Sequence, residues 1–501
     1  MKFFLIILSC LFVLTKPARS QSLSTELNSI ALDNDMMGCA VVTFCESQIL
    51  DTYYYGKSDY QRNIYTDQHT KFRIASISKT ITASAIMQLS EQNMLDLNAD
   101  ISSILGYNVQ NPYFPNTAIT VKMLLSHTSS IIDGTTYNSF MQATVNNNPI
   151  INLSELLTQG GNYYSASQFN SKTPGSYFNY SNINYVILGT IVEKISGLRF
   201  DIYCNQHIFE PLSLDASFNV NDLQDINQVA VLYRKTSGVW TPQADNFQGT
   251  QPVHTNLAGY VPGTNGGRFG PQGGLRISAQ DLVKIFMCIF NPDLCTSPLV
   301  SAQSSANMIA NHWTYFGNNG NYYSGLFRSW GLGIHRITST PGNDIVLPGS
   351  QAMFGHTGEA YGLVSDAYYD FNRKTGLVFI TNGVGVGYQT NSNSAFYTVE
   401  QDVFNAIEEY GNLNTCFTVN IDPRVKKDET FVVSTNQACN TLNISLTNFT
   451  KACTLKIYNT EAKQVMETLI VSPESTINIS SLNKGIYLLQ IDQQFERFVK
   501  F

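Results

Sequence analysis

The chain has 501 residues and a mass of 55.7 kDa; 43% of its residues are hydrophobic and only 13% are charged. This composition excludes a highly charged disordered protein, and the length is enough for two or three domains. The formal net charge is −7, from 37 acidic and 30 basic residues. No basic run of the kind that nucleic-acid binding requires is present, so we expect no nucleic-acid partner.

The first 20 residues predict a secretory signal peptide. Lys2 precedes an apolar run over residues 3–14, and Ala18-Arg19-Ser20 provides small residues for cleavage before Gln21. A membrane anchor is the alternative, but this run falls short of the ~20 apolar residues that a spanning helix needs. We therefore expect a secreted protein without a spanning segment, which is extracellular or, in a bacterium, in the periplasm or on the outer surface.

Eight cysteines follow the signal, an even number that suits disulfides in an exported protein. Cys288 and Cys295 flank a short turn and are the expected pair. Cys39 and Cys45 lie on the same side of a strand-like run, too far apart to bridge each other. A further bridge is expected among the three C-terminal cysteines, at positions 416, 439 and 453.

The elements predicted from residue 24 onward indicate an α+β domain. A helical segment over residues 24–33 precedes two strand-like runs, 39–44 and 49–55, which predict a hairpin. Helical patterns follow at residues 76–92, 121–125, 184–195, 279–290 and 395–410, and a strand-rich region spans residues 353–382. Strands near both ends predict one antiparallel sheet that the terminal segments complete together, flanked by helices and with a helical region inserted.

A second domain is predicted from about residue 412. Short strand-like runs recur there every ~8–12 residues, as in a small all-β sandwich. The domain order is therefore signal peptide 1–20, main domain 21–411 and β-domain 412–501. Three segments near the end, Lys456–Tyr458, Leu482–Leu488 and Phe498–Lys500, resemble the C-terminal sorting domains of type IX bacterial secretion, although the glycine expected after Tyr458 is absent. A plain accessory domain and a surface-adhesion module are the alternatives.

Ser76-Ile77-Ser78-Lys79 is the first segment that suggests chemistry. Residues three apart on a helix share a face, so the Lys79 amine is expected beside the Ser76 hydroxyl, where it can take the hydroxyl proton. A serine at a helix start also has free backbone N–H groups near a developing oxyanion. Apolar residues recur every four positions along this helix and predict its buried stripe: Ile77, Ile81, Ala85 and Leu89.

Five segments in the same order resemble the serine β-lactamase and penicillin-binding-protein superfamily, above all its class C and esterase-like branch. They are Phe72–Thr80, Leu124–Ser129, Pro174–Asn182, Gly273–Asp281 and Gly355–Gly358. The resemblance implies a β-lactamase/transpeptidase-like fold and catalysis through a covalent acyl-enzyme.

The resemblance also implies roles for individual residues. Ser76 is the nucleophile, and Tyr180 exchanges protons with it beside Lys79; for this work the phenol pKa of ~10 should fall, which a lysine cation favours. Asn182 is expected to orient the substrate or Lys79. A structural tyrosine in the core is the alternative for Tyr180. His127 is expected to fix loop backbone rather than to act as a base.

The third motif of the family, K-T-G, has two candidates in this chain. Lys374-Thr375-Gly376 matches it literally, but it separates two strand-like runs and is predicted to form a hairpin connection with Gly376 at its end. We assign the motif to His356-Thr357-Gly358, a known variant. Glu359 would then supply the second oxyanion N–H, and its carboxylate could narrow the pocket or repel anionic substrates.

The sequence thus predicts a secreted serine hydrolase that acts on a small-molecule or peptide acyl donor without metal or cofactor, since no metal-ligand spacing is present. A mostly neutral His356 and the charge of Glu359 favour neutral esters or amides over anionic acyl donors. The alternatives are a true β-lactamase or D-Ala-D-Ala peptidase, and an inactive recognition protein that keeps the fold.

Overall fold

The structure is a computed structural model. It describes residues 22–46, 48–146, 150–252, 257, 259–350, 353–413, 431–435, 441–446, 451–459, 463–483, 485–491 and 494–500. The expected signal peptide, Cys416, Cys439 and the strand predicted at residues 417–421 lie outside this range. The chain divides into two compact units, residues 1–417 and 418–501, and each is described by itself.

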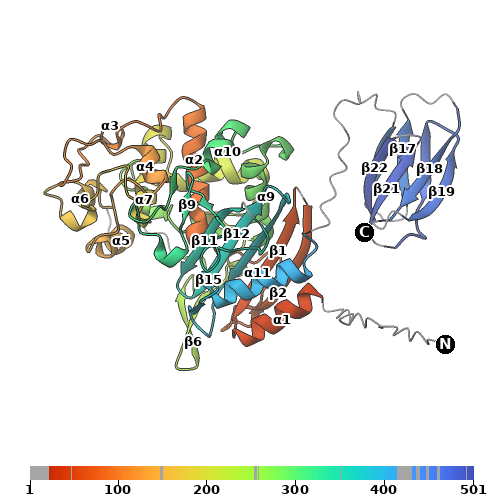
Figure 1. Cartoon of the computed structure of the whole chain (residues 1–501), viewed down its shortest axis with the longest axis horizontal. Helices are drawn as coiled ribbons and strands as arrows, with labels where there is room; N and C mark the ends of the chain where they lie inside the picture. Colours follow the sequence, from red (N-terminus) through yellow and green to blue (C-terminus); the bar gives the residue numbers. More distant parts are fainter. Residues whose placement is uncertain are drawn as a thin grey trace, which may run out of the picture. The chain divides into compact units, whose positions relative to one another are not determined.

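A nine-stranded antiparallel sheet forms the centre of the first unit (Figure 1). β1 (Gly38–Cys45) forms the predicted hairpin with β2 (Gln48–Asp59) and also pairs with β13 (Thr375–Thr381), from Cys39 opposite Thr381 to Cys45 opposite Thr375. The N- and C-terminal parts of the unit therefore complete one sheet, as predicted. The other strands in sheet order are β3 (Ile64–Tyr65) beyond β2, then on the far side of β13, β12 (Leu363–Asp370), β11 (Met353–Ala360), β10 (His335–Arg336), β9 (Ser329–Trp330) and β8 (Trp313–Thr314).

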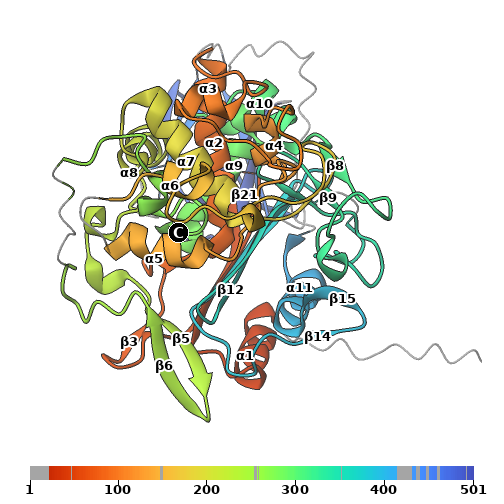
Figure 2. The ribbon, with the colours of Figure 1, turned by 90° about the vertical axis from the view of Figure 1, so that its left-hand side faces the viewer.

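Both faces of this sheet are covered by helices. Alternate β1 residues such as Val41 join the apolar cluster with α1 (Leu23–Asp33) and α11 (Thr398–Tyr410), whereas Ala40, Val42 and Phe44 join the cluster with α2 (Ser78–Glu91) and α9 (Ala279–Phe290). Figure 2 shows the sheet edge-on between these two layers. Because neither face of β1 reaches water, all eight of its residues are buried.

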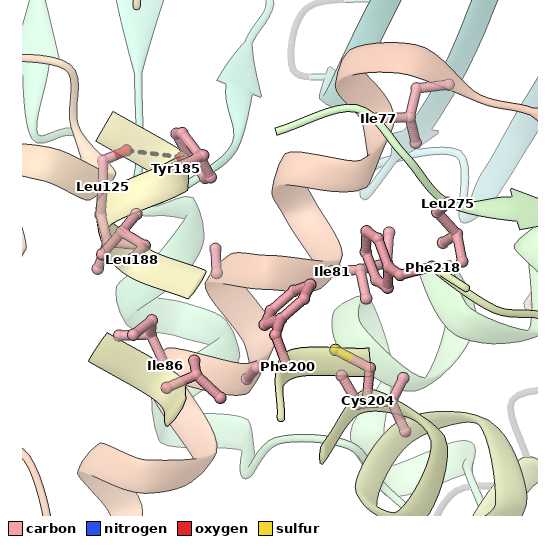
Figure 3. Close-up of a cluster of buried hydrophobic side chains, with 14 of the residues drawn as sticks. Ile77, Ile81, Ile86, Leu125, Tyr185, Leu188, Phe200, Cys204, Phe218 and Leu275 are labelled. Atoms are coloured by element: carbon pink, nitrogen blue, oxygen red, sulfur yellow. Dashed lines mark hydrogen bonds between the residues drawn. The ribbon is translucent and has the colours of Figure 1, made fainter. Parts of the chain in front are cut away.

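Helix α2 lies inside the first unit rather than on its surface. Ile77, Ile81, Ala85 and Leu89 are buried as predicted, but so are most of the polar residues of the helix. Those polar side chains bond to backbone carbonyls: Thr80 Oγ1 donates to Gly333 O at 2.9 Å, Thr82 Oγ1 donates to Pro271 O at 2.7 Å, and Ser84 Oγ donates to Thr80 O at 3.0 Å. Figure 3 shows the apolar side chains around α2, including Phe200 and Tyr185.

The inserted helical region lies beside α2. α7 (Asn182–Ser196) packs directly on α2, and its Tyr185 hydroxyl donates to Leu125 O at 3.1 Å (Figure 3). The other α-helices are α3 (Ile101–Leu105), α4 (Val121–Leu125), α5 (Tyr137–Asn146), α6 (Ser154–Leu157), α8 (Phe200–Cys204) and α10 (Ala302–Ile309). The short strand pairs are β4 (Phe72–Arg73) with β7 (Arg276–Ile277), β5 (Leu232–Thr236) with β6 (Val239–Ala244), and β14 (Thr390–Asn391) with β15 (Ser394–Tyr397).

The connection between β12 and β13 differs from the prediction in one detail. Lys374 adopts the left-handed conformation (φ 56°) in the turn, and Gly376 already lies inside β13 opposite Tyr369. A Cβ atom on Gly376 would lie 2.2 Å from the Phe44 ring, so this glycine serves close packing within the sheet rather than the turn. Lys374 pairs with Glu46 at 3.0 Å and is half-exposed.

The second unit is built from two antiparallel sheets, as the predicted sandwich requires. One has the order β16 (Phe431–Thr435), β17 (Thr441–Leu446), β20 (Glu474–Asn478), and the other β19 (Gln464–Ile470), β18 (Cys453–Tyr458), β21 (Gly485–Ile491), β22 (Gln494–Lys500). Leu442 and Ile444 of the first sheet share one apolar core with Leu455, Ile457 and Leu489 of the second. β20 was missing from the predicted strands, because its polar residues Glu474, Ser475 and Thr476 give little apolar alternation.

Four of the described cysteines bear on the predicted disulfides. Cys288 and Cys295 form a disulfide with a Cα–Cα distance of 5.3 Å, as expected. Cys45 is disulfide-bonded, and Cys39 is a buried free thiol, in agreement with the expectation that these two do not bridge each other. Among the residues that the structure describes, no helix has the length and apolar character needed to traverse a bilayer.

Candidate active site

Ser76 lies in a tight turn between β4 and α2. Residues Ala75–Ile77 form a 3-10 turn and α2 begins at Ser78, two residues later than the predicted helix start. Ala75 adopts the left-handed conformation (φ 45°), which costs a non-glycine residue about 1–2 kcal/mol and is found where surrounding structure enforces it. The turn therefore presents Ser76 ahead of the first free N–H groups of the helix.

The Lys79 amine is buried beside Ser76 and has three hydrogen-bond partners. Nζ donates to Ser76 Oγ at 2.8 Å, to Asn182 Oδ1 at 2.9 Å and to the backbone O of Gln272 at 2.7 Å. Lys79 has no exposed surface. Burial lowers the pKa of this amine to about 7, while the nearby carboxylate of Asp133 acts in the opposite direction. Both protonation states are thus available near neutral pH.

Asn182 is held in place by the carboxylate of Asp133. The Asn182 side-chain Nδ2 donates to Asp133 Oδ2 at 2.9 Å, and the backbone N–H groups of Asn182 and Ile183 donate to the same carboxylate at 3.1 and 2.8 Å. Asp133 thereby binds the N-terminus of α7, where a negative charge is stabilising. This contact fixes the amide so that its Oδ1 faces Lys79.

Tyr180 completes the cluster from the loop before α7. Lys79 Nζ lies 4.9 Å from the centre of the Tyr180 ring. Burial raises the pKa of the phenol well above its usual value, and the nearby Ser76 hydroxyl offsets this only in part. The expectation that the pKa of Tyr180 falls is therefore wrong for this structure, because loss of water around the phenol outweighs any attraction to the lysine. Tyr180 is neutral here, and Lys79 is the group with a pKa near 7.

Strand β11 runs past Ser76 and leaves one edge unpaired there. β10 pairs only with Phe354 and Gly355, so within the described residues positions 356–360 of β11 have a strand partner on the β12 side alone. A Cβ atom on Gly358 would lie 3.1 Å from Ser76 N and 2.7 Å from Ile74 O. Only glycine permits this approach, which brings the β11 edge next to the Ser76 backbone N–H.

The residues around Gly358 alternate between the two faces of β11. The buried His356 ring lies on the Ser76 side, with its centre 6.0 Å from that of Tyr180 and 5.3 Å from that of Trp330. Its Nδ1 donates to Thr357 O at 2.5 Å, and burial holds its pKa well below the usual value, so the ring is neutral.

Thr357 and Glu359 have side chains on the opposite face, toward α11. Thr357 Oγ1 donates to Glu400 Oε1 at 3.2 Å, and the Tyr397 hydroxyl donates to Glu359 Oε2 at 2.6 Å. The Glu359 carboxylate is therefore turned away from Ser76, and in this conformation it does not narrow the space above the serine as the sequence suggested.

His127 has the structural position that was expected for it. Its ring is buried, and Nδ1 accepts a hydrogen bond from the Ser181 backbone N–H at 3.2 Å, which ties the 127 loop to the segment that carries Tyr180. The ring centres of His127 and Tyr180 are 4.4 Å apart, so the histidine ring also packs against the Tyr180 ring. In the described part of the chain, no three His, Cys, Asp or Glu residues come together as a metal site would require.

Sequence reasoning missed two residues that position Lys79. Asp133 lies in a loop between α4 and α5, and Gln272 acts through its backbone carbonyl, which any residue type could provide. Neither position carries a signal in a single sequence. By contrast, the spacing of Ser76 and Lys79 was sufficient to predict that these two side chains meet.

Comparison with known proteins identifies the family of the main unit and of the tail. A family model described as Beta-lactamase matches residues 33–395, and the model of the secretion system C-terminal sorting domain matches residues 436–500. Protein flp of Staphylococcus aureus (strain MW2) is 30% identical over 160 residues, which are 32% of this chain. The match spans only 30% of the length of flp.

Solved structures agree with the arrangement of the sheet and helices. The octameric penicillin-binding protein homologue from Pyrococcus abyssi has a TM-score of 0.57 at 18% identity, with 95% of this chain and 99% of that chain covered. EstCE1, a hydrolase with promiscuous acyltransferase activity, has a TM-score of 0.55 at 20% identity, with 77% and 99% covered. D-amino acid amidase from Ochrobactrum anthropi SV3 has a TM-score of 0.54 at 18% identity, with 77% and 98% covered. These likenesses concern the fold alone. The family model, by contrast, covers well over half of the sequence, and the chain therefore belongs to the β-lactamase family.

Proposed function

We propose that the protein is an exported serine hydrolase in which Ser76 forms an acyl-enzyme with an ester or amide substrate. The observation that carries this proposal is the 2.8 Å hydrogen bond between Lys79 Nζ and Ser76 Oγ, made by an amine whose burial lowers its pKa to about 7. An amine with this pKa can accept the serine proton at neutral pH, which an ordinary lysine cannot do.

The three partners of Lys79 suit both protonation states of its amine. As an ammonium ion, Nζ donates to Ser76 Oγ, Asn182 Oδ1 and Gln272 O together. As a neutral amine it has two hydrogens, which can remain on the two carbonyl oxygens, and a lone pair that can accept the Ser76 proton. The same geometry therefore serves the amine before and after proton transfer.

The proposed reaction proceeds in two stages. Ser76 Oγ attacks the substrate carbonyl carbon while its proton passes to Lys79, and the backbone N–H groups of Ser76 and Glu359 hold the oxyanion. Tyr180, a neutral phenol beside Ser76, passes a proton to the leaving alcohol or amine and regains one from Lys79. Water then attacks the acyl-enzyme by the reverse proton path and releases the acid.

Neutral esters and amides are proposed as substrates ahead of β-lactams. The family motif usually provides a lysine cation for the carboxylate of a β-lactam or D-Ala-D-Ala peptide, whereas His356 is buried and neutral here. The names of the esterase and amidase of similar fold are consistent with this choice. A β-lactamase or peptidase remains the second candidate, and an inactive recognition protein has no evident need for a lysine pKa near 7.

Labelling with a fluorophosphonate tests the proposal directly. We expect one adduct, on Ser76, and Ser76-dependent hydrolysis of p-nitrophenyl butyrate that exceeds turnover of a chromogenic cephalosporin. Ser76→Ala should reduce kcat by at least about 10³-fold without loss of fold, because it removes only a hydroxyl. An adduct on another residue, or no adduct on folded protein, would contradict the proposal.

We infer that the second unit directs export. The sorting-domain model matches residues 436–500, most of the described strands of this unit, and it supports secretion through the type IX system. The signal peptide expected at residues 1–20 would carry the chain across the first membrane on this route.

A further inference from the structure

A cavity of about 850 Å³ lies beside the Ser76 cluster, and no role has yet been given to it. Gln272, whose carbonyl accepts a hydrogen bond from Lys79, forms part of its wall. Tyr361, in the turn after β11, and Arg73, three residues before Ser76, also line it. The cavity is large enough for the acyl part of a drug-sized substrate and begins next to the proposed proton path.

The described walls of this cavity are polar and carry excess positive charge. Seven asparagine or glutamine residues line it, together with three arginines, Arg73, Arg268 and Arg276, and one acidic residue, Asp245. Amide side chains both donate and accept hydrogen bonds, as peptide groups and sugar hydroxyls require. The walls therefore suit a polar acyl group rather than a plain hydrocarbon chain.

Asp245 holds two of the arginines at the strand pair β4–β7. Arg73 Nε and Nη2 donate to its carboxylate at 3.0 and 2.8 Å, and Arg276 Nε and Nη2 donate at 3.2 and 2.7 Å. The two arginines hold the pKa of Asp245 well below its usual range, so the carboxylate stays charged. Two cations thus share one anion, and one positive charge is left over.

The remaining donors of Arg73 are available for a ligand. Arg276 Nη1 donates to Gly274 O at 2.8 Å and to Phe218 O at 3.4 Å, so this guanidinium is largely used. Within the described residues, no protein group accepts a hydrogen bond from Arg73 Nη1, and the Tyr361 ring lies 5.5 Å from the Arg73 guanidinium carbon. Asp245 fixes one edge of the Arg73 guanidinium and Tyr361 packs on it, which leaves a preorganised cationic donor at the cavity wall.

We propose that this cavity binds the acyl half of the substrate and that Arg73 pairs with a carboxylate carried by that half. The inference rests on the proposed function and specifies its substrate class: a polar, peptide-like or sugar-like acyl group with an acidic substituent. It refines the expectation that anionic acyl donors bind poorly, which considered only the charges beside His356. His356 and Tyr361 lie at opposite ends of the open part of β11, so the two ends of a bound substrate meet different charges.

A matched pair of esters tests the inference in the intact chain. 4-Nitrophenyl hydrogen suberate and methyl 4-nitrophenyl suberate have the same acyl chain and leaving group and differ only in the terminal carboxylate. We expect kcat/KM for the acid to exceed that for the methyl ester, and this ratio to fall as ionic strength rises. A ratio of one or less in the parent protein would overturn the inference without need of any variant.

Two substitutions should move this ratio in opposite directions. Arg73→Gln removes the proposed partner and should lower the ratio about tenfold, the usual order for a lost charge-assisted hydrogen bond. Asp245→Asn removes the anion that competes for Arg73 and should raise the ratio. General damage to the site cannot lower the ratio in one variant and raise it in the other. Lys374→Gln, which changes a cation at the distant β12–β13 turn, should leave the ratio unchanged. An Arg73→Gln ratio equal to the parent ratio, in folded protein, would also refute the inference.

The outcomes separate this inference from the proposed function. If the neutral methyl ester is hydrolysed and Ser76→Ala abolishes its hydrolysis, the serine-hydrolase proposal stands whatever the ratio is. If the hydrolysis of both esters survives Ser76→Ala, the proposed function fails, and the inference fails with it.

Discussion

The protonation state of Lys79 should set the lower pH limit of activity. The folded pKa of this amine is lowered to about 7, and only the neutral amine can accept the Ser76 proton. Activity on a neutral ester should therefore be small at pH 5 and rise through pH 7 to a plateau. Lys79→Ala should cost about 10²–10⁴-fold in kcat, the usual contribution of a positioned base. The measurement is kcat/KM for p-nitrophenyl butyrate from pH 5 to 9.

Two further variants assign this pH dependence to one residue. Lys79→Arg keeps a cation that cannot lose its proton, so it should be as inactive as Lys79→Ala although it preserves the charge. Tyr180→Phe should be slower than the parent but retain the rise near pH 7. If the rise disappears in Tyr180→Phe while Lys79→Arg remains active, the phenol and not the amine is the base.

At the residue scale, the sequence predicted neighbours better than it predicted their chemistry. A spacing of three residues determines that Ser76 and Lys79 meet, because helical geometry is local. The direction of the Tyr180 pKa was wrong because it depends on how completely the surrounding segments exclude water, and no motif records this. Asp133 was missed for the same reason: its contact with Asn182 is made by a loop 49 residues away.

At the element scale, α11 is joined to the sheet by two buried carboxyl groups. Asp366 of β12 and Glu400 of α11 are fully or almost fully buried, and each shifts the pKa of the other. Two buried carboxylates that lie close together repel each other when both are ionised, so at least one of them retains a proton. Burial raises the pKa of Glu400 to about 7 and that of Asp366 well above its usual value. Glu400 also accepts hydrogen bonds from Thr357 Oγ1 and the Tyr397 backbone N–H.

This pair should make the protein less stable as pH rises. Below pH 4 the carboxyls are protonated in both the folded and the unfolded states, whereas between about pH 4 and 7 only the folded state retains the shared proton. The free energy of unfolding should therefore fall across this window, on the order of 2 kcal/mol. Asp366→Asn, which can donate to Glu400 without a titrating proton, should reduce this fall. Urea unfolding at pH 5 and pH 8 measures it.

A control on the same helix separates the pair from general effects on α11. Glu408→Gln removes the ion pair with Arg373, 2.6 Å long and partly exposed, and should leave the difference between the two pH values as it is in the parent. An equal pH dependence in the parent and Asp366→Asn would show that the shared proton does not contribute to stability.

The elements that were predicted poorly are those whose stability comes from distant partners. α4 and α9 were predicted with their observed bounds because their apolar periodicity and caps are local. Residues 395–397 were included in a predicted helix but belong to β15, which pairs with β14, and Tyr397 then caps α11. The strands β8, β9 and β10 have two residues each, too few to show alternation. They depend on successive pairing, in which β10 pairs with β11, β9 with β10 and β8 with β9.

At the scale of the whole molecule, the two units have separate apolar cores. The core of the second unit consists of residues between Leu442 and Ile491. The two main apolar clusters of the first unit contain no described residue after Leu413. The family models show the same division, with one match ending at residue 395 and the other beginning at residue 436. Catalysis and export are therefore expected to depend on different parts of the chain.

A chain that ends at residue 417 should fold and remain active but lose its export. Every residue proposed for the Ser76 site and the acyl cavity lies before residue 414, so removal of residues 418–501 leaves all of these residues in the chain. We expect kcat/KM for p-nitrophenyl butyrate within about twofold of the full chain. In a host with type IX secretion, the full chain should appear outside the cell, whereas the shortened chain should stay inside the outer membrane. If the shortened chain is exported, the second unit is not needed for export. If the shortened chain is folded but inactive, the second unit contributes to catalysis.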